Sequence, residues 1–369
     1  MKRQLLASAL AAALALPIVV GAVGTAQAAD AIKMRVQTIF PSASMYFGML
    51  QDMEKRINRM SGGRLDVEML PVGAVVGFTE TLTAVHQGIV EAGVTGAHFH
   101  SGKVSAAYLF ADQPAVGGLD QLSAVAWFLE GDGNKLYREM HDDHLKVNII
   151  PFITLLSGGQ PLGWFKNPIE NLEDFQKLKY RSPPGITGEL FTTMGITAVA
   201  LPGGEIVPSA ERGVIDAAEW INPGEDINLG LQDIWKNYYL QGFHQATDIT
   251  ELIINKDFWN KLPDDLQAII ETATLATITT TLTGNIYRNA VALNELKEKH
   301  GVKVYDTPPD LFAAFAAASE EVMAKHKAAD PFFKKVAESQ EEFAKVVVPY
   351  WTKLLALYAS MGEAALAKN

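Results

Sequence analysis

The sequence of 369 residues contains no cysteine. This absence excludes disulfide bonds, thiol nucleophiles and thiolate metal sites. A chain of this length buries enough apolar surface to fold without covalent cross-links, and it favours an organisation into two lobes.

Positive charge is also scarce. Lys and Arg number 31 against 42 Asp and Glu, which gives a formal net charge of −11. Binding to nucleic acid requires clustered Lys and Arg that neutralise phosphates, so we do not expect nucleic acid as a partner. A small anionic ligand is not excluded, because it responds to the local charge of its site.

Long apolar runs are confined to the N-terminus. Lys2 and Arg3 precede an apolar stretch over residues 5–23, and Ala26-Gln27-Ala28 has the A-x-A pattern of a cleavage site. A membrane anchor is the alternative, but the stretch is rich in Ala and Gly, and no later run reaches the roughly 18 apolar residues of a span. We therefore expect a signal peptide over residues 1–28, cleavage near Ala28 and export to the periplasm.

The remaining sequence alternates strand and helix patterns, which favours an α/β fold with a mostly parallel sheet. Strands are predicted at 32–38, 65–70, 92–94, 147–153, 197–201, 214–218, 250–255 and 302–305. Helices are predicted at 45–60, 79–87, 205–212, 263–300 with a break near Gly284, 308–328 and 343–366 with a kink at Pro349. The strands at 147–153 and 250–255 are expected to cross between the lobes.

These crossings divide the chain into lobes that are each discontinuous in sequence. We expect lobe I to comprise residues 29–153 and about 249–280, and lobe II residues 154–248 and about 281–340, with a helical extension over 341–369. Ligands of open α/β sheets bind where strands end.

Three residues lie where strands are expected to end, closely enough to meet in one cleft: Arg181, Glu219 and Trp220. Arg181 ends a charged-apolar alternation over 177–181, and Glu219 and Trp220 follow the predicted strand 214–218. The guanidinium of Arg181 matches a carboxylate bidentately, although a surface ion pair is the commoner fate of arginine. Glu219 either binds a cation, pairs with Arg181, or lies in water at the rim. Trp220 forms the floor of the cleft or part of the core.

Two further positions are candidates for the cleft. Gln160 follows Gly158 and Gly159, which permit close backbone approach, and its amide offers an oxygen to a cation or hydroxyl; the alternative is a solvated turn residue. His98 and His100 suggest a metal site, but no third ligand stands at a recognisable spacing, so loop histidines that hydrogen-bond or face solvent are the simpler interpretation. Phe99 between them lines the cleft or joins the core.

The sequence resembles the substrate-binding proteins of tripartite ATP-independent periplasmic (TRAP) transporters, the DctP-type family, over nearly the whole exported chain. The matching segments are Ser61-Gly62-Gly63-Arg64-Leu65, Gln160 ahead of Phe165, Leu178-Lys179-Tyr180-Arg181, Leu201-Pro202-Gly203-Gly204-Glu205-Ile206 and Gly213-Val214-Ile215-Asp216-Ala217-Ala218-Glu219-Trp220. The resemblance implies a two-lobed, type II-like periplasmic binding protein with long C-terminal helices. Gln160 and the Glu219-Trp220 ending resemble the branch that binds 2-oxo or 2-hydroxy monocarboxylates with a metal cation.

That branch implies a role for each matching residue. Arg181 would bind the ligand carboxylate, and Trp220 and Phe99 would line the pocket. The side chains of Gln160 and Glu219, with the main-chain oxygen of Trp220, would hold Na⁺ or Ca²⁺ together with the ligand, and all-oxygen ligation suits such a hard cation. Delivery to the membrane permease subunits would follow.

The sequence departs from this branch at three places. Phe99 stands where the branch tends to carry a tyrosine, Ile221-Asn222-Pro223-Gly224 replaces an aromatic, and Phe243-His244-Gln245-Ala246-Thr247-Asp248 replaces a Gly-rich segment. All three are expected to line the pocket, so they affect the choice of ligand side chain.

The C-terminal helix is more apolar than a surface helix requires. It packs on its own lobes or on a second subunit, and the related branch includes dimers formed through this helix, so a homodimer is expected. A periplasmic enzyme with Glu219 as a base is the rival function, but no nucleophile elbow or HExxH motif supports it. A third alternative is a sensor component that uses the same binding lobes.

Overall fold

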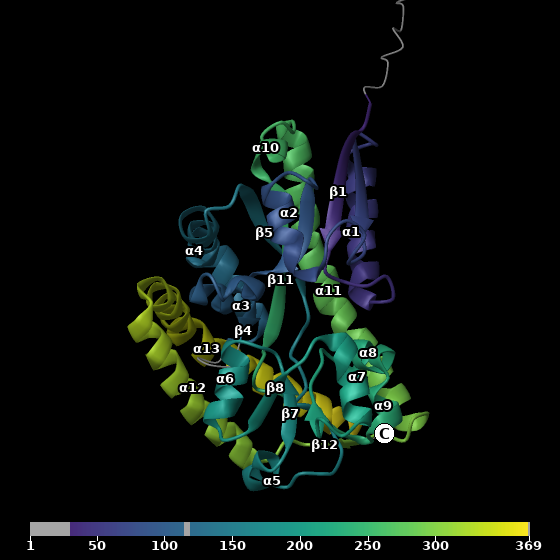
Figure 1. Cartoon of the computed structure of the whole chain (residues 1–369), viewed down its shortest axis with the longest axis vertical. Helices are drawn as coiled ribbons and strands as arrows, with labels where there is room; N and C mark the ends of the chain where they lie inside the picture. Colours follow the sequence, from purple (N-terminus) through teal and green to yellow (C-terminus); the bar gives the residue numbers. More distant parts are fainter. Residues whose placement is uncertain (1–29, 114–118, 368–369) are drawn as a thin grey trace, which may run out of the picture. The chain divides into compact units, whose positions relative to one another are not determined.

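The computed structural model describes residues 30–113 and 119–367 (Figure 1). The predicted signal peptide lies outside these residues. Among the helices of the described part, none is long and apolar enough to cross a membrane.

The first sheet has the strand order β2-β1-β3-β11-β4. β4 pairs with residues 247–248 of β11, and β5 pairs with residues 249–255 of the same strand. Its strands are β1 (Ile32–Thr38), β2 (Leu65–Leu70), β3 (Ala92–Gly96), β4 (Asp112–Gln113), β5 (Ile149–Leu156) and β11 (Thr247–Asn255). β1 pairs in parallel with β2 and β3, whereas β11 pairs antiparallel with β3, β4 and β5. The sheet is therefore mixed, and the predicted mostly parallel sheet is wrong because both long crossing strands run side by side in opposite directions.

The helices of this part are α1 (Met45–Met60), α2 (Thr81–His86), α3 (Gln121–Glu130), α4 (Gly133–Glu139), α10 (Lys256–Trp259) and α11 (Asp264–Glu298). α1 begins where Ser44 caps it by accepting a hydrogen bond from Tyr46 N, and its apolar face is buried. α11 packs on α1 and β5 and continues through Gly284, so the predicted break is wrong. A Cβ at Gly284 would lie 2.9 Å from Met49 Cε, and the glycine therefore serves the close packing of α11 on α1.

The second sheet has the order β12-β10-β6-β9-β7-β8 and is also mixed. Its strands are β6 (Gly163–Phe165), β7 (Lys179–Ser182), β8 (Thr197–Ala200), β9 (Ala217–Ala218), β10 (Asn237–Tyr239) and β12 (Lys303–Tyr305). Helices α5 (Leu172–Gln176), α6 (Ile186–Thr193), α7 (Gly203–Glu211), α8 (Pro223–Leu229) and α9 (Leu231–Ile234) connect these strands. β9 is shorter than the predicted strand over 214–218, because Gly213 to Asp216 form the turn out of α7.

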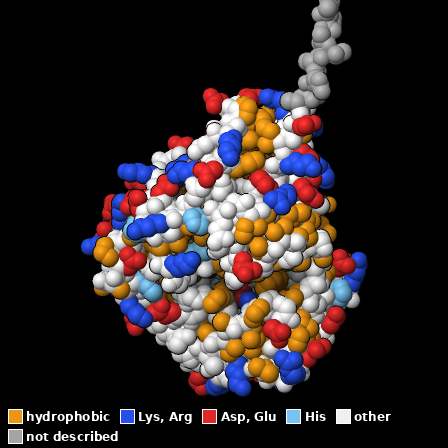
Figure 2. Space-filling model, turned by 45° about the horizontal axis from the view of Figure 1, so that its top comes forward, with side chains coloured by type: hydrophobic (Ala, Val, Ile, Leu, Met, Phe, Trp, Pro, Cys, Tyr) orange, Lys and Arg blue, Asp and Glu red, His pale blue; other side chains and the backbone are white. Residues whose placement is uncertain are grey.

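Two long helices complete the chain, α12 (Pro309–Ala329) and α13 (Pro331–Leu366). α13 continues through Pro349, and its first half packs on α12, α3 and α4. Its second half exposes large apolar side chains, with five of them on one side of the helix, Val346, Tyr350, Leu357, Tyr358 and Met361, and Leu355 and Leu366 on the other. Figure 2 shows one face of the molecule, on which apolar patches alternate with charged side chains and surround a hollow near the centre.

Candidate functional site

The parallel pairing of β7 with β9 brings the predicted anchor and the predicted metal ligand together. Arg181 pairs with Ala218 in this register, and Glu219 follows at once, with Glu219 N donating to Arg181 O at 3.3 Å. β7 is flanked by β8 on its other side, so Arg181 lies inside the sheet and not at its edge. Register alone therefore places both side chains at the same end of two adjacent strands.

The two side chains form a buried ion pair. Arg181 Nη1 donates to Glu219 Oε1 and, at 3.1 Å, to the main-chain oxygen of Glu219. Nε and Nη2 both donate to Leu201 O, at 3.0 and 2.8 Å. Arg181 is 6% exposed and Glu219 is 0% exposed. Arg181 therefore does not form a surface ion pair, and Glu219 is not a solvated carboxylate at the rim. Of the alternatives for Glu219, the structure shows the pairing with Arg181.

Burial dominates the protonation of this pair. Removal from water raises the pKa of Glu219 to about 8, while the neighbouring Arg181 guanidinium acts in the opposite direction and the carboxylates of Asp226 and Asp112 reinforce the rise. Because ionisation of the buried Glu219 carboxyl group is costly, the group favours either a bound proton or a second cation beside its carboxylate.

Gln160 supplies the third predicted group. One terminal atom of its side-chain amide lies 2.8 Å from Gln245 Oε1, 3.0 Å from Trp220 O and 3.1 Å from Glu219 Oε2. All three neighbours are hydrogen-bond acceptors, so an amide nitrogen at this position donates to them, whereas an amide oxygen there would join an all-oxygen cluster that needs a positive charge. Gln160 is buried and is not a solvated turn residue.

Trp220 contributes its side chain as well as its main-chain oxygen. Its ring lies 5.4 Å from the Arg181 guanidinium carbon, in cation–π range. A Cβ at Gly203 would lie 2.3 Å from the ring, which explains why glycine opens α7 at this point. Phe99 belongs to the 3₁₀-helix Ala97–His100 after β3. The centroid of its ring lies 4.6 Å from that of the Phe78 ring and 3.9 Å from that of the His98 ring.

Gln245, which no sequence motif singles out, links this cluster to the first sheet. Its main-chain oxygen accepts from Gln160 N at 3.0 Å, and its Nε2 donates to Asp112 Oδ1 at 2.5 Å. The sequence signals this residue only through its place in the segment 243–248, which departs from the related branch.

His244 belongs to the same segment, which the sequence predicts to line the pocket. It is fully buried against Phe191 and Phe243, and neither ring nitrogen has a hydrogen-bond partner among the described residues. Burial, together with the positive charge of Arg181, lowers the pKa of His244 to about 3, so the ring is neutral at physiological pH. A neutral imidazole retains one donor and one acceptor.

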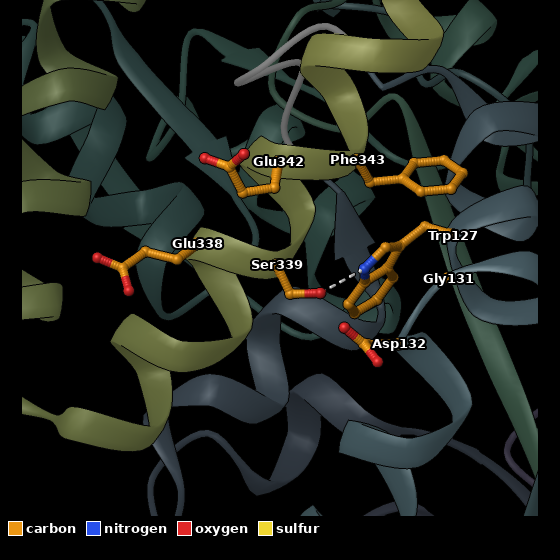
Figure 3. A pocket seen from close by; sticks show the side chains of 7 residues that line it. All are labelled: Trp127, Gly131, Asp132, Glu338, Ser339, Glu342 and Phe343. Carbon is orange, nitrogen blue, oxygen red and sulfur yellow. Dashed lines mark hydrogen bonds between the residues drawn. The ribbon is translucent and has the colours of Figure 1, made fainter.

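A separate cavity of about 320 Å³ lies between the end of α3 and α13 (Figure 3). Trp127 Nε1 donates to Ser339 Oγ at 3.0 Å across it, and three carboxylates line its wall, those of Asp132, Glu338 and Glu342. None of the predicted site residues lines this cavity. We attribute it to the packing of α13 on the body of the protein.

Comparison with known proteins supports a single family. The model of the bacterial extracellular solute-binding proteins, family 7 (DctP), matches residues 36–330. The monocarboxylate 2-oxoacid-binding periplasmic protein all3028 of Nostoc sp. is 31% identical over 316 residues, which cover 86% of this chain and 85% of that protein.

Solved structures agree with this result. A TRAP transporter solute-binding protein from Bordetella bronchiseptica, a dimer with copurified calcium and picolinate, superposes with a TM-score of 0.84 at 26% identity, covering 92% of this chain and 99% of that one. A TRAP solute-binding protein from Pseudoalteromonas atlantica with sodium and pyruvate gives 0.81 at 25% identity, with 89% and 99% covered. One from Colwellia psychrerythraea with calcium and pyruvate gives 0.80 at 25% identity, with 92% and 100% covered.

Proposed function

The chain belongs to the bacterial extracellular solute-binding proteins, family 7, which serve TRAP transporters, and we propose that it captures a 2-oxo or 2-hydroxy monocarboxylate together with Na⁺ or Ca²⁺. Its family and its relatives are transport proteins, so it is a solute-binding protein and not an enzyme. Glu219 therefore has no role as a catalytic base.

The observation that carries the proposal is the convergence of Arg181, Glu219, Gln160 and the Trp220 main-chain oxygen. These are the groups that a carboxylate and a hard cation require: a guanidinium fork and a set of oxygen donors. The donor set fits the cation, because Glu219 Oε2 and Trp220 O both lie within 3.1 Å of the Gln160 amide, which presents its oxygen to a metal ion by a simple rotation. A bound cation supplies the positive charge that the buried Glu219 carboxylate otherwise takes from Arg181.

Cation and carboxylate thus support each other. Nη1 of Arg181 is occupied by Glu219 in this structure. When a cation balances Glu219, the guanidinium becomes available to the ligand carboxylate, and the ligand in turn neutralises Arg181. The reciprocity required of two linked sites then predicts that each partner raises the affinity for the other.

The other residues expected in the pocket, Phe99 and His244, would determine which ligand side chains it accepts. Phe99 offers an apolar ring without the hydrogen bond of a tyrosine. His244 offers a neutral imidazole whose two nitrogens have no partner among the described residues. A short ligand such as pyruvate, with its oxygens at Arg181 and the cation, leaves these two residues to contact the remainder of a longer acid.

Binding between two lobes would shift an open–closed equilibrium toward a closed form that the TRAP membrane permease subunits recognise. The two sheets, divided between residues 29–153 with about 249–280 and residues 154–248 with about 281–340, would form these lobes. We further propose that residues 1–28 direct export to the periplasm and are cleaved near Ala28, and that two copies associate through the exposed apolar side of α13.

A thermal-shift screen tests the function. Pyruvate, lactate and longer 2-oxo and 2-hydroxy acids are each added to the chelator-treated protein with and without Ca²⁺ or Na⁺. We expect a 2-oxo or 2-hydroxy monocarboxylate to raise Tm more with the cation than without it, while acetate, which lacks the 2-oxygen, has a smaller effect. A protein that responds to none of these acids, with or without cation, would contradict the proposal.

A further inference from the structure

Three side chains from separate elements of the first sheet converge beside the carboxylate site. His98 comes from the 3₁₀-helix after β3, Asp112 from β4 and Asp248 from β11. One ligand atom from each lies within 4.8 Å of the other two. Asp112 is buried, and His98 and Asp248 are partly buried, so the cluster lies at the edge of the protein interior.

The distances within this cluster do not fit hydrogen bonds. His98 Nδ1 lies 3.6 Å from Asp248 Oδ1 and 3.8 Å from Asp112 Oδ1. Hydrogen bonds between nitrogen and oxygen are shorter, at about 2.7–3.2 Å. Two atoms bound to one tetrahedral Zn²⁺ at about 2.1 Å are separated by roughly 3.4 Å, which is close to the observed spacing.

Two of these atoms are otherwise without partners. Within the described residues, neither His98 Nδ1 nor Asp248 Oδ1 makes a hydrogen bond, although both atoms are buried. Buried polar atoms of native proteins are nearly always satisfied. An ion between the three side chains would satisfy both atoms at once and offset the two neighbouring carboxylates.

The supporting contacts hold all three residues in place. Gln245 Nε2 donates to Asp112 Oδ1, and the main chain of Asp248 is fixed by Ser157, whose Oγ accepts from Asp248 N at 2.8 Å. The centroids of the His98 and Phe99 rings lie 3.9 Å apart. The His98 ring also packs on Gly96, where an added Cβ would lie 2.6 Å from His98 Cε1. Such outer contacts orient metal ligands in known sites.

We propose that His98, Asp112 and Asp248 form a second metal site, specific for a divalent transition ion such as Zn²⁺. One imidazole nitrogen and two carboxylate oxygens suit Zn²⁺ or Co²⁺ better than the hard cation of the all-oxygen site, and three protein ligands leave a fourth position for water or a ligand atom. The site is separate from Gln160, Glu219 and Trp220 and does not depend on carboxylate binding. Gln245 bridges the two sites, with its oxygen toward Gln160 and its nitrogen on Asp112.

The test is calorimetric titration of chelator-treated full-length protein with Zn²⁺ alone. We expect a high-affinity equivalent that weakens at least tenfold in His98→Gln and in Asp248→Asn. His300→Gln, which removes an imidazole far from the cluster in sequence, is the matched control and should keep this equivalent. Glu219→Gln should also keep it, which separates this site from the carboxylate site.

A histidine NMR spectrum of the unmutated protein guards against variants that fail to fold. Zn²⁺ should shift the resonances of one histidine ring at one equivalent, and a folded His98→Gln should lack that response. The proposal is overturned if the protein binds no Zn²⁺ equivalent, or if His98→Gln and His300→Gln bind Zn²⁺ equally well.

Discussion

Arg181 and Glu219 form a buried ion pair in which Nη1 of the guanidinium donates to both the side-chain and the main-chain oxygen of the glutamate. The pair arises from adjacent parallel strands, and it joins the group suited to a carboxylate to the group suited to a cation. A ligand and its cation therefore enter a site where the guanidinium is already hydrogen-bonded to the glutamate.

Replacement of Arg181 by lysine should separate the contribution of its positive charge to pyruvate binding from that of its planar guanidinium geometry. Lysine keeps the positive charge beside Glu219 but loses the planar fork, so we expect pyruvate affinity to fall about 10- to 100-fold, the equivalent of one charge-assisted hydrogen bond. Calorimetry with pyruvate in saturating Ca²⁺ measures the loss. Arg181→Ala should abolish binding, and near-parental affinity in either variant would remove Arg181 from the anchor role.

The raised pKa of Glu219 predicts a pH dependence of stability. Its folded-state pKa of about 8 lies above its ordinary value of 4.5, so the folded state holds a proton that the unfolded state loses. The resulting stabilisation is complete below the ordinary value and is lost as pH rises through about 8. Urea unfolding of the ligand-free protein should show this fall relative to Glu219→Gln, in which the group cannot ionise.

The same shift makes a cation compete with a proton at Glu219. Calcium affinity should therefore rise with pH below about 8, approaching tenfold per pH unit, and the rise should be absent in Glu219→Gln. Equal pH dependence in the two proteins would assign the proton to another group.

Replacement of His244 by phenylalanine should change stability and ligand affinity in opposite directions. Its unpartnered nitrogens are buried among aromatic rings, and leaving such a group unsatisfied costs about 1–3 kcal/mol. His244→Phe should thus raise the free energy of unfolding by about 1 kcal/mol. If the imidazole contacts the ligand, affinity for longer 2-oxo acids should fall at the same time, as measured by calorimetry. Lower stability with unchanged affinity would show that the ring is only a structural element.

The apolar side of α13 predicts the oligomeric state. Val346, Tyr350, Leu357, Tyr358 and Met361 are all exposed along one side of the helix. Leu357→Glu should convert a dimer to a monomer in gel filtration with light scattering, because it places a charge in the centre of this surface. Ala359→Glu lies on the other side of the helix and should leave the dimer intact. A purely monomeric parent protein would refute the interface.

Much of this fold could be predicted from local patterns. β1, α1 and β2 match the predicted ranges at both ends, because alternation, the cap at Ser44 and the Ser61-Gly62-Gly63 stop are local signals. The mixed first sheet was missed because the direction of β11 depends on contacts between residues distant in sequence. Gly284 was misread as a helix break, since its actual role depends on Met49 of another helix.

The candidate site divides in the same way. Arg181, Glu219, Gln160 and Trp220 were predicted by their positions after strands and by family resemblance, and the structure brings them together. The second and third members of the cluster around His98 could not be predicted from the sequence. Asp112 and Asp248 stand 14 and 150 residues from His98, and only the antiparallel pairing of β11 with β4 aligns them.

The most direct test of the central claim is a crystal structure of the protein grown with Ca²⁺ and pyruvate. We predict calcium within about 2.3–2.6 Å of a Glu219 carboxylate oxygen, the Gln160 amide oxygen and the Trp220 main-chain oxygen, with the pyruvate carboxylate on Arg181. Calcium at other residues, or pyruvate bound while both Nη1 hydrogen bonds to Glu219 persist and Arg181 makes no contact with it, would contradict the account.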